Sequence, residues 1–289
     1  MSKRAKSTVI GIELEAGLPA EALFPFYNGG GGRYSLNTPS VSSVIGRLQA
    51  HAQKAILKLK MDEGFERPDV GIDGAGDILE LRYKVTTVEN LIKHRSSYKT
   101  IIDYLKNELF LETSHPTAGM HVHLDRDYMD KDSFIRMLKF VQKELIFVGM
   151  FSERRHRMLS YCKPDTLTIP DCLKNIEADY STYGTSDNAI RLNRPEAAKG
   201  VHTVEFRLFQ SVLDIDKFIA NAMFAERLAT FCNETEHTRK LNRLEFIDFI
   251  KESGVLYSTL MDDIKEKGLD EKILERQEEV ETLNEILFD

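Results

Sequence analysis

The chain has 289 residues, of which 42% are hydrophobic and 29% charged, and its formal net charge is −7. This composition excludes a disordered chain and argues against a general nucleic-acid binder, which needs a basic surface. No apolar run approaches the about 20 residues of a membrane span, and none follows the basic N-terminus as in a signal peptide. Three scattered cysteines predict neither a disulfide framework nor a zinc cluster, so we expect a cytoplasmic protein.

The first predicted strand spans residues 8–16, where apolar and polar side chains alternate. One face is aliphatic and the other carries two carboxylates, because strand side chains repeat every two residues. Taken alone, the pattern favours an exposed edge strand with two solvated glutamates. The aliphatic residues are Ile10, Ile12 and Leu14, and the polar face holds Gly11, Glu13 and Glu15.

Four consecutive glycines, Gly29–Gly32, precede Arg33. Glycine backbone can approach a ligand closely, so one interpretation is a lid over phosphates with Arg33 as the contact. The lysine and hydroxyl residue of a P-loop are missing here, and a flexible hairpin tip is the favoured interpretation.

A strand is predicted between two amphipathic helices. Apolar residues at helical spacing predict helices over residues 41–60 and 87–111. Between them, residues 71–83 predict a turn-rich entry into a strand with Glu80 and Arg82 on its polar face. A surface ion pair between these two side chains would stabilise the protein little, so this strand alone indicates no site.

The segment AGMHVHLD, residues 118–125, places two imidazoles and a carboxylate on one face of a strand. That donor set is typical of ligand or metal binding. A solvated sheet face with two chance histidines is the alternative, and this stretch by itself supports both equally. The polar face holds His121, His123 and Asp125, and the other face Met120, Val122 and Leu124.

A third helix is predicted over residues 132–151, and four basic or imidazole side chains, Arg154 to Arg157, follow it. Such a run could clamp a phosphate or complement the negative end of the helix dipole. The second role is favoured for Arg155 and His156, whereas Arg154 and Arg157 stay open to either. Residues 164–184 show little periodicity and predict a long loop.

Two more strands are predicted after this loop. Residues 189–193 alternate and put Arg191 and Asn193 on one face. Residues 201–209 form the clearest strand of the chain, with alternating apolar and polar side chains. Its polar face holds Thr203, Glu205 and Arg207.

The C-terminal part is predicted to be helical. Asp216 is expected to cap a helix over residues 217–232, and charged helices are expected from residue 234 onward. Residues 271–287 combine spaced Ile and Leu residues with many acids. They predict a docking or oligomerisation helix, with a solvated acidic face as the alternative.

The polar faces of four predicted strands are rich in carboxylates and imidazoles. Clustered carboxylates repel one another unless cations or protons intervene. Oxygen-rich sets with few imidazoles suit Mg²⁺ or Mn²⁺, whereas zinc favours more His or Cys. A curved antiparallel sheet, with helices behind and metals in front, accounts for all four strands. The residues concerned are Glu13, Glu15, Glu80, Arg82, His121, His123, Glu205 and Arg207.

The order of these motifs resembles the ATP-dependent carboxylate–amine ligases, the superfamily of glutamine synthetase and glutamate–cysteine ligase. The compact amidoligase family is the most similar branch, and the resemblance covers about residues 8–232. The glycine run and the C-terminal helices have no counterpart in it. The motifs are GIELE (11–15), ILELRY (78–83), GMHVHL (119–124), TVEFRLF (203–209) and the basic-then-SYC stretch (154–162).

The resemblance implies that a carboxylate attacks the γ-phosphate of ATP to give an acyl phosphate, from which an amine or ammonia displaces phosphate. Mg²⁺ or Mn²⁺ would neutralise the phosphate oxygens. His123 would lie at the nucleotide phosphates, Arg207 would stabilise the transferring phosphoryl group, and Arg191 would hold substrate carboxylate or phosphate. The implied metal ligands are Glu13, Glu15, Glu80, His121 and Glu205. The catalytic set is Arg207, Glu205 and Arg191, with Arg33 and Arg157 as further nucleotide-binding candidates.

We therefore expect an α+β fold, with a glutamine synthetase-like catalytic domain over residues 1–234 and a helical extension over residues 235–289. The expected substrates are small-molecule or peptide carboxylates and amines. We expect neither nucleic-acid nor membrane partners, and the C-terminal helices could form a homo-oligomer. Two alternatives remain: a metal-dependent hydrolase that works without ATP, and a non-catalytic scaffold that retains the fold.

Overall fold

The computed structural model describes seven ranges: residues 8–19, 41–72, 78–115, 117–154, 189–192, 203–234 and 239–270. The glycine run, Arg33, Arg157, Asn193 and the predicted helix over residues 271–287 lie outside these ranges. The predictions made for them therefore stay predictions.

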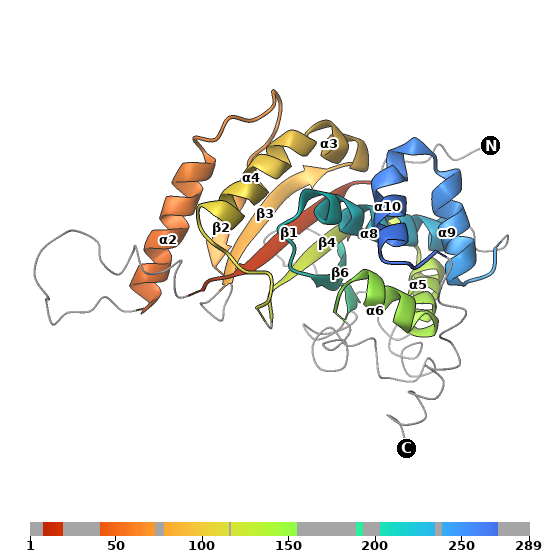
Figure 1. The fold of residues 1–289 in the computed structure, drawn as a ribbon. Helices are drawn as coiled ribbons and strands as arrows, with labels where there is room; N and C mark the ends of the chain where they lie inside the picture. The colour runs from red at the N-terminus through yellow and green to blue at the C-terminus, as the bar shows by residue number, and fades with distance from the viewer. Residues whose placement is uncertain are drawn as a thin grey trace, which may run out of the picture.

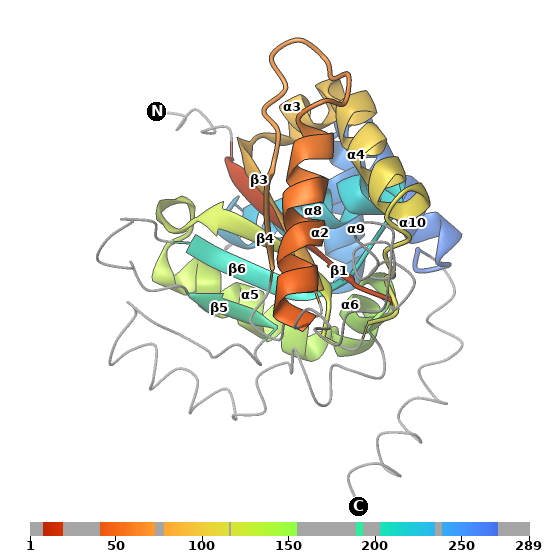
Figure 2. The same ribbon diagram turned by 90° about the vertical axis from the view of Figure 1, so that its left-hand side faces the viewer.

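The centre of the protein is a sheet of six strands, each paired antiparallel with its neighbours, in the order β2-β3-β1-β4-β6-β5. Figure 2 shows β1 and β4 between β3 and β6, with β5 beyond β6. The predicted α+β class and antiparallel sheet are confirmed, while β2 had been predicted only as a turn-rich entry. The strands are β1 (Ile10–Gly17), β2 (Asp69–Ile72), β3 (Ile78–Thr86), β4 (Gly119–Asp125), β5 (Ile190–Leu192) and β6 (Thr203–Gln210).

Helices pack against the apolar face of the sheet and against one another, with α8 at their centre (Figure 1). Helix α8 is buried along most of its length and contacts β1, β4 and most of the other helices. The helices are α2 (Val41–Ile56), α3 (Val88–Lys93), α4 (Arg95–Asn107), α5 (Lys131–Lys143), α6 (Leu145–Phe151), α8 (Ile215–Glu234), α9 (Arg243–Glu252) and α10 (Ser258–Glu266). Short 3₁₀ turns span Arg126–Tyr128 and Val255–Tyr257.

Two helices predicted as continuous are each broken, so those predictions were wrong. The first breaks at His94 (φ −101°, ψ 20°) between α3 and α4, and the second at Glu144 (φ −106°, ψ 34°) between α5 and α6. Both residues leave the helical region of the backbone map. Neither break carries a glycine or proline, so the sequence had no local signal for it. Each half keeps its own apolar face in the core.

The predicted cap of α8 was also wrong by two positions. The carboxylate of Asp214 accepts hydrogen bonds from the backbone N–H groups of Asp216 (2.9 Å) and Lys217 (3.1 Å). Asp216 lies in the first turn and pairs with Arg95 at 2.5 Å. Both acids stand near the helix start, and the helix begins two residues earlier than its apolar pattern indicated.

The alternation predicted for the strands explains how the sheet joins the helices. Tyr83 on the apolar face of β3 has ring contacts with Tyr98 of α4 (5.2 Å) and Phe218 of α8 (5.5 Å). The aliphatic residues of β1, namely Ile10, Ile12 and Leu14, are at most 1% exposed. One face of the sheet therefore packs in the hydrophobic core, and the polar side chains lie together on the opposite face.

Helices α9 and α10 belong to the same hydrophobic core as the sheet layer. Phe246 of α9 is fully buried and contacts Phe140 (5.3 Å) and Phe224 (5.4 Å). The predicted domain boundary at residues 234/235 therefore falls within one core, and it stays a prediction.

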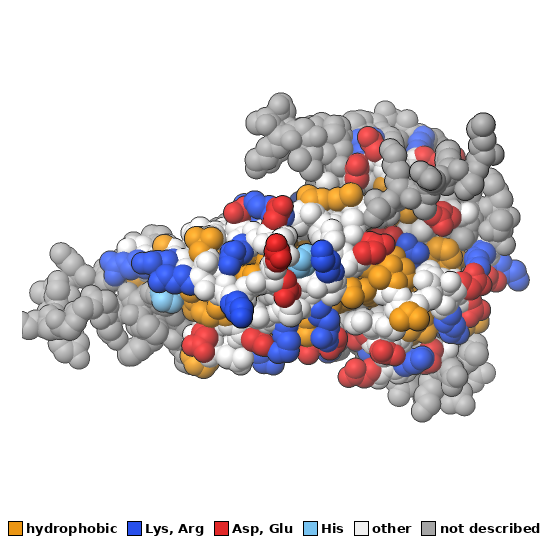
Figure 3. Space-filling view, turned by 90° about the horizontal axis from the view of Figure 1, so that it is seen from above, with side chains coloured by type: hydrophobic (Ala, Val, Ile, Leu, Met, Phe, Trp, Pro, Cys, Tyr) orange, Lys and Arg blue, Asp and Glu red, His pale blue; other side chains and the backbone are white. Residues whose placement is uncertain are grey.

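The outer surface over the helices is charged. Figure 3 shows Lys and Arg side chains gathered at the α2 end of the molecule, where Arg47, Lys54 and Lys58 are exposed. Over the rest of this view acidic and basic side chains lie scattered among hydrophobic and uncharged ones. In the described part of the chain, no helix combines the length and the apolar character needed to cross a bilayer.

Candidate functional site

Strand register brings the predicted site residues into neighbouring positions on the polar face of the sheet. Glu13 of β1 stands opposite Arg82 of β3 on one side and His121 of β4 on the other. One row further along, Gly11 stands opposite His123, which is opposite Glu205, which is opposite Arg191. Glu15 is paired in register with Glu80. Segments far apart in sequence thus form one continuous polar surface.

A register shift between β4 and β6 places Arg207 beside this row. Met120 pairs with Phe209 and Val122 with Phe206, so β6 carries one more residue than β4 over this stretch. Such a bulge redirects the side chains on either side of it. Phe209 consequently joins the core, where its ring contacts Phe224 of α8 at 6.0 Å. The simple alternation predicted for this strand fails at the bulge, because alternation assumes one residue opposite one residue.

Glu205 lies at the centre of a buried group of charges and is fully shielded from solvent. One carboxylate oxygen, Oε2, accepts a hydrogen bond from Nε of Arg191 (2.5 Å), and Oε1 accepts one from Nη1 of Arg207 (2.7 Å). Burial alone would raise the pKa of Glu205, but the charges of His123 and of the two arginines outweigh it and lower that pKa to about 2. Glu205 is therefore ionised at neutral pH.

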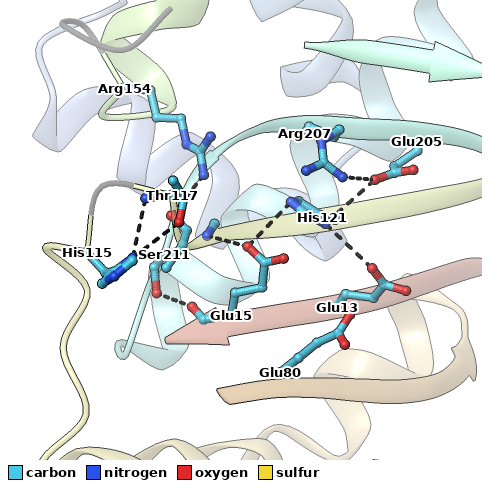
Figure 4. A network of polar contacts seen from close by, with 12 residues as sticks. Glu13, Glu15, Glu80, His115, Thr117, His121, Arg154, Glu205, Arg207 and Ser211 are labelled. Atoms are coloured by element: carbon cyan, nitrogen blue, oxygen red, sulfur yellow. Dashed lines mark hydrogen bonds and ion pairs between the residues drawn. The ribbon is translucent and has the colours of Figure 1, made fainter. Parts of the chain in front are cut away.

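His121 is buried among three carboxylates, with 2% of its surface exposed. Its Nδ1 lies 3.5 Å from Oε2 of Glu13 and 3.6 Å from Oε1 of Glu205, and its Nε2 lies 3.7 Å from Oε2 of Glu15. Figure 4 shows the imidazole between these side chains. Among the described residues, neither ring nitrogen has a hydrogen-bond partner.

Burial and the neighbouring ionisable groups together set the pKa values in this cluster. Burial is the largest influence on His121 and lowers its pKa to about 4, against the opposing effect of Glu13, so its ring is neutral at pH 7. Burial also acts on His123, but contact with Glu13 and the charge of Glu205 outweigh it and raise the pKa of His123. Burial would raise the pKa of Glu13, yet its contacts with the two histidines hold that pKa well below the usual range.

This arrangement leaves an electrostatic conflict at His121. A neutral imidazole carries one N–H and one lone pair. Because both ring nitrogens face carboxylate oxygens, at least one lone pair points toward negative charge. A cation between the imidazole and the carboxylates would resolve the conflict.

Glu15 is held in place by hydrogen bonds that involve the backbone. Its Oε2 accepts a hydrogen bond from the N–H of Gly119 (2.9 Å), and the hydroxyl of Ser211 donates to its backbone carbonyl. The guanidinium of Arg154 donates to the carbonyl of Ala118 (2.9 Å) at the same place. Ser211 and Gly119 were not predicted as site residues, because Gly119 donates from its backbone N–H and Ser211 donates to a backbone carbonyl, and neither contact leaves a mark in side-chain patterns.

The remaining predicted residues lie at the edges of the cluster. Glu80 is buried and pairs with Arg82, whose side chain is 57% exposed. His123 places its Nε2 3.5 Å from Oε2 of Glu13. Asp125 is exposed at the end of β4. Arg33 and Arg157 lie outside the described residues, so their predicted contacts with a nucleotide stay predictions.

The donor set of the cluster fits a hard divalent cation. Carboxylate oxygens outnumber imidazole nitrogens, which suits Mg²⁺ or Mn²⁺. The short contacts are pairwise: within the described ranges, no group of three or more His, Cys, Asp or Glu side chains already stands in a metal-holding arrangement. Within the described residues the ring nitrogens of His121 form no hydrogen bond and lie next to ionised carboxylates, and this is the observation that favours a cation here.

A buried carboxylate–imidazole–arginine cluster on the polar face of an antiparallel α+β sheet is the class of site that the fold defines. The family model described as "Putative amidoligase enzyme" matches residues 85–229, half of the chain. The chain belongs to the amidoligase family, which confirms the resemblance inferred from the motif order. No curated protein matches the chain.

Three solved structures share distant similarity with the chain. They are a novel glutamine synthase homolog (12% identity, TM-score 0.42), Plasmodium falciparum glutamine synthetase (10%, 0.45) and ligand-free GmaS (9%, 0.39). The matches cover 91%, 97% and 95% of this chain and 65%, 73% and 70% of those structures. The chain thus spans about two thirds of the length of the structures it matches, and similarity at this level transfers no residue roles.

Proposed function

We propose that this protein is an ATP-dependent ligase that joins a carboxylate to an amine through an acyl phosphate, with Mg²⁺ or Mn²⁺ at the buried cluster. The observation that carries the proposal is His121, a neutral imidazole whose two ring nitrogens face the carboxylates of Glu13, Glu15 and Glu205 and form no hydrogen bond among the described residues. Membership of the amidoligase family supports the ligase class.

The proposed reaction has two steps. A substrate carboxylate oxygen attacks the γ-phosphorus of ATP, and the bond to the oxygen that leaves with ADP breaks. The amine nitrogen then attacks the carbonyl carbon of the acyl phosphate, inorganic phosphate leaves, and a proton is released as the amide forms. Bound divalent ions would supply charge neutralisation at the phosphate oxygens.

The side chains of the cluster divide into two proposed groups. We keep Glu13, Glu15, Glu80, His121 and Glu205 as the metal ligands, because these are the oxygen and imidazole donors that the sheet register gathers. The arginines form the second group. Arg207 and Arg191 are held in place by the two oxygens of Glu205, and we propose that these oriented guanidiniums donate to a phosphoryl group or a substrate carboxylate when substrates bind. His123 is proposed to contact the nucleotide phosphates.

The substrate class follows from the proposed reaction. We propose a small-molecule or peptide carboxylate and a small-molecule or peptide amine. A cytoplasmic location and a homo-oligomer formed through the C-terminal helices also remain proposals. The hydrolase and scaffold alternatives are outcomes of the following test.

The first experiment measures the thermal midpoint of the full chain with Mg²⁺ alone, with ATP alone, and with both. A ligand at a hundred times its Kd stabilises the folded state by about 2.7 kcal/mol. For a chain of this size that corresponds to a shift of roughly 5–10 °C. We expect the full shift only when Mg²⁺ and ATP are present together, followed by ADP release when acids and amines are screened.

Two matched variants test whether the shift in thermal midpoint depends on the buried cluster. Glu13→Gln should abolish the combined shift, whereas Glu89→Gln, an exposed carboxylate in the first turn of α3, should preserve it. A wild-type protein whose thermal midpoint shifts under none of the three conditions contradicts the ligase and favours the scaffold. A shift with metal alone, together with hydrolysis of a simple ester, would favour the hydrolase.

A further inference from the structure

Arg154 follows α6, and its charged side chain is buried beside the start of β4, with 2% of its surface exposed. Its Nη2 donates to the carbonyl of Ala118 (2.9 Å). A Cβ built on Gly119 would lie 2.0 Å from the same Nη2 and 3.0 Å from the carbonyl oxygen of Phe209. Any side chain at residue 119 would therefore displace the guanidinium, so glycine at this position makes room for it.

Arg154 and Glu15 bind the two ends of one peptide group. The guanidinium donates to the C=O of Ala118, and the N–H of Gly119 in the same peptide unit donates to Oε2 of Glu15 (2.9 Å). The peptide is planar and trans, so its C=O and N–H are fixed relative to each other. A cation on the C=O also polarises the peptide and strengthens its N–H as a donor.

The oxygen that this peptide holds is the one that faces the cluster. Oε2 of Glu15 lies 3.7 Å from Nε2 of His121. Figure 4 shows Arg154 and His121 on opposite sides of the Glu15 carboxylate. A rotation of the Ala118–Gly119 peptide would break both hydrogen bonds and move this oxygen relative to the imidazole.

The backbone before Arg154 is fastened to the C-terminal helices. Glu153 adopts a left-handed conformation (φ 60°), which is unfavourable for a residue other than glycine and needs contacts to hold it. Its carboxylate pairs with Lys217 of α8 (2.6 Å) and with Lys267 just after α10 (3.4 Å). Lys267 also donates to the carbonyl of Phe151 (2.7 Å).

We infer that Arg154 is a positioning residue for Glu15, acting through the Ala118–Gly119 peptide, and that Lys267 secures Arg154 from the C-terminal helices. This inference rests on the proposed metal site, because it assigns Glu15 a fixed orientation toward a cation. It gives the C-terminal helices a role in the site, in contrast to an extension that only mediates assembly.

The test measures Mn²⁺ binding to the full chain by electron paramagnetic resonance, without nucleotide. Replacing a residue that orients a metal ligand costs about ten- to a hundredfold in metal affinity. We expect Arg154→Met to weaken Mn²⁺ binding by that factor and Arg154→Lys to restore part of it. Arg67→Met is the matched control, because Arg67 likewise donates to backbone carbonyls, those of Ile56 and Leu59, away from the cluster.

Failure of the proposed metal site and failure of the positioning role of Arg154 give different results. If the wild-type protein binds no Mn²⁺, the proposed metal site fails. If it binds Mn²⁺ and Arg154→Met binds equally well, the positioning role is overturned while the metal site stands.

A second variant covers the case in which Arg154→Met does not fold. Lys267→Met keeps the guanidinium and removes the contacts of Lys267 with Glu153 and Phe151, together with its ion pair to Asp263, so it should weaken Mn²⁺ binding several-fold. Lys251→Met, which removes an exposed lysine paired with Asp248, should leave binding unchanged. Wild-type affinity in both Lys267→Met and Arg154→Lys, with Arg154→Met unfolded, would contradict the inference.

Discussion

Arg207 donates from Nη1 to Oε1 of Glu205 over 2.7 Å, although the two residues stand only two positions apart on the same strand. Side chains two residues apart share a face of a strand, and the bulge of β6 begins at this point. The pair is buried, with Glu205 fully shielded and Arg207 7% exposed. A buried carboxylate needs such a partner, because an unpaired charge in the interior is costly.

Arg207 is expected to act on the transferring phosphoryl group. Arg207→Met should lower kcat by about 10²–10³-fold, the usual loss when one donor to developing charge is removed. Arg207→Lys should recover only part of the rate, because lysine lacks the planar fork. ADP release under saturating ATP measures the effect. Arg95→Met is the control, since that guanidinium is partly exposed and pairs with Asp216 of α8, away from the cluster, and equal rates in both methionine variants would exclude the assigned role.

His121 should stay neutral well below the pH at which a free histidine protonates. Its burial lowers the pKa to about 4, so protonation should be seen only near that pH. Imidazole ¹⁵N chemical shifts of the metal-free protein, with the signal assigned from His121→Gln, report the charge directly. A midpoint at or above the ordinary value of 6.5 would show that the ring is already an imidazolium paired with the carboxylates.

Glu205 should make the protein sensitive to acid. Its pKa in the folded state is about 2, compared with an ordinary 4.5, so the unfolded chain binds a proton first as the pH falls. The stabilisation it provides is complete above about pH 4.5 and is lost as the pH falls toward 2. The difference corresponds to roughly 3 kcal/mol.

Urea denaturation between pH 6 and pH 3 tests this pH dependence. Glu205→Gln should lose less stability over that range than the wild-type protein, because the titrating group is gone. Glu89→Gln controls for the removal of one negative charge. Parallel curves for the wild type and Glu205→Gln would argue against a depressed pKa at this carboxylate.

Phe246 should show that α9 is part of the main core. Phe246→Ala removes a fully buried ring that contacts Phe140 and Phe224, and should cost about 3–5 kcal/mol of unfolding free energy. Leu244→Ala, on the same helix but 48% exposed, should cost less than about 1 kcal/mol. Guanidinium denaturation measures both. A small effect of Phe246→Ala, with a separate transition, would instead support an independent helical extension.

Much of the sheet and its polar face could be predicted because period-two alternation is a local property. Glu13, Glu15, His121, His123 and Glu205 were assigned to polar faces from their spacing alone, and the register brings those faces together. The helix breaks at His94 and Glu144 could not be predicted this way. They carry no glycine or proline and arise where each half of the helix packs in the core.

The sequence by itself determined which side chains face away from the core and which donor types they offer, because both follow from the order of residues along each strand. Only the tertiary structure decided which of these residues are neighbours. The pairing order of the strands sets Glu205 between two arginines, and the bulge of β6 sets Arg207 beside its row. Arg154 contacts the peptide 36 residues before it, and the N–H of that peptide binds Glu15, which lies 104 residues from Gly119. Such contacts depend on packing that no local pattern records.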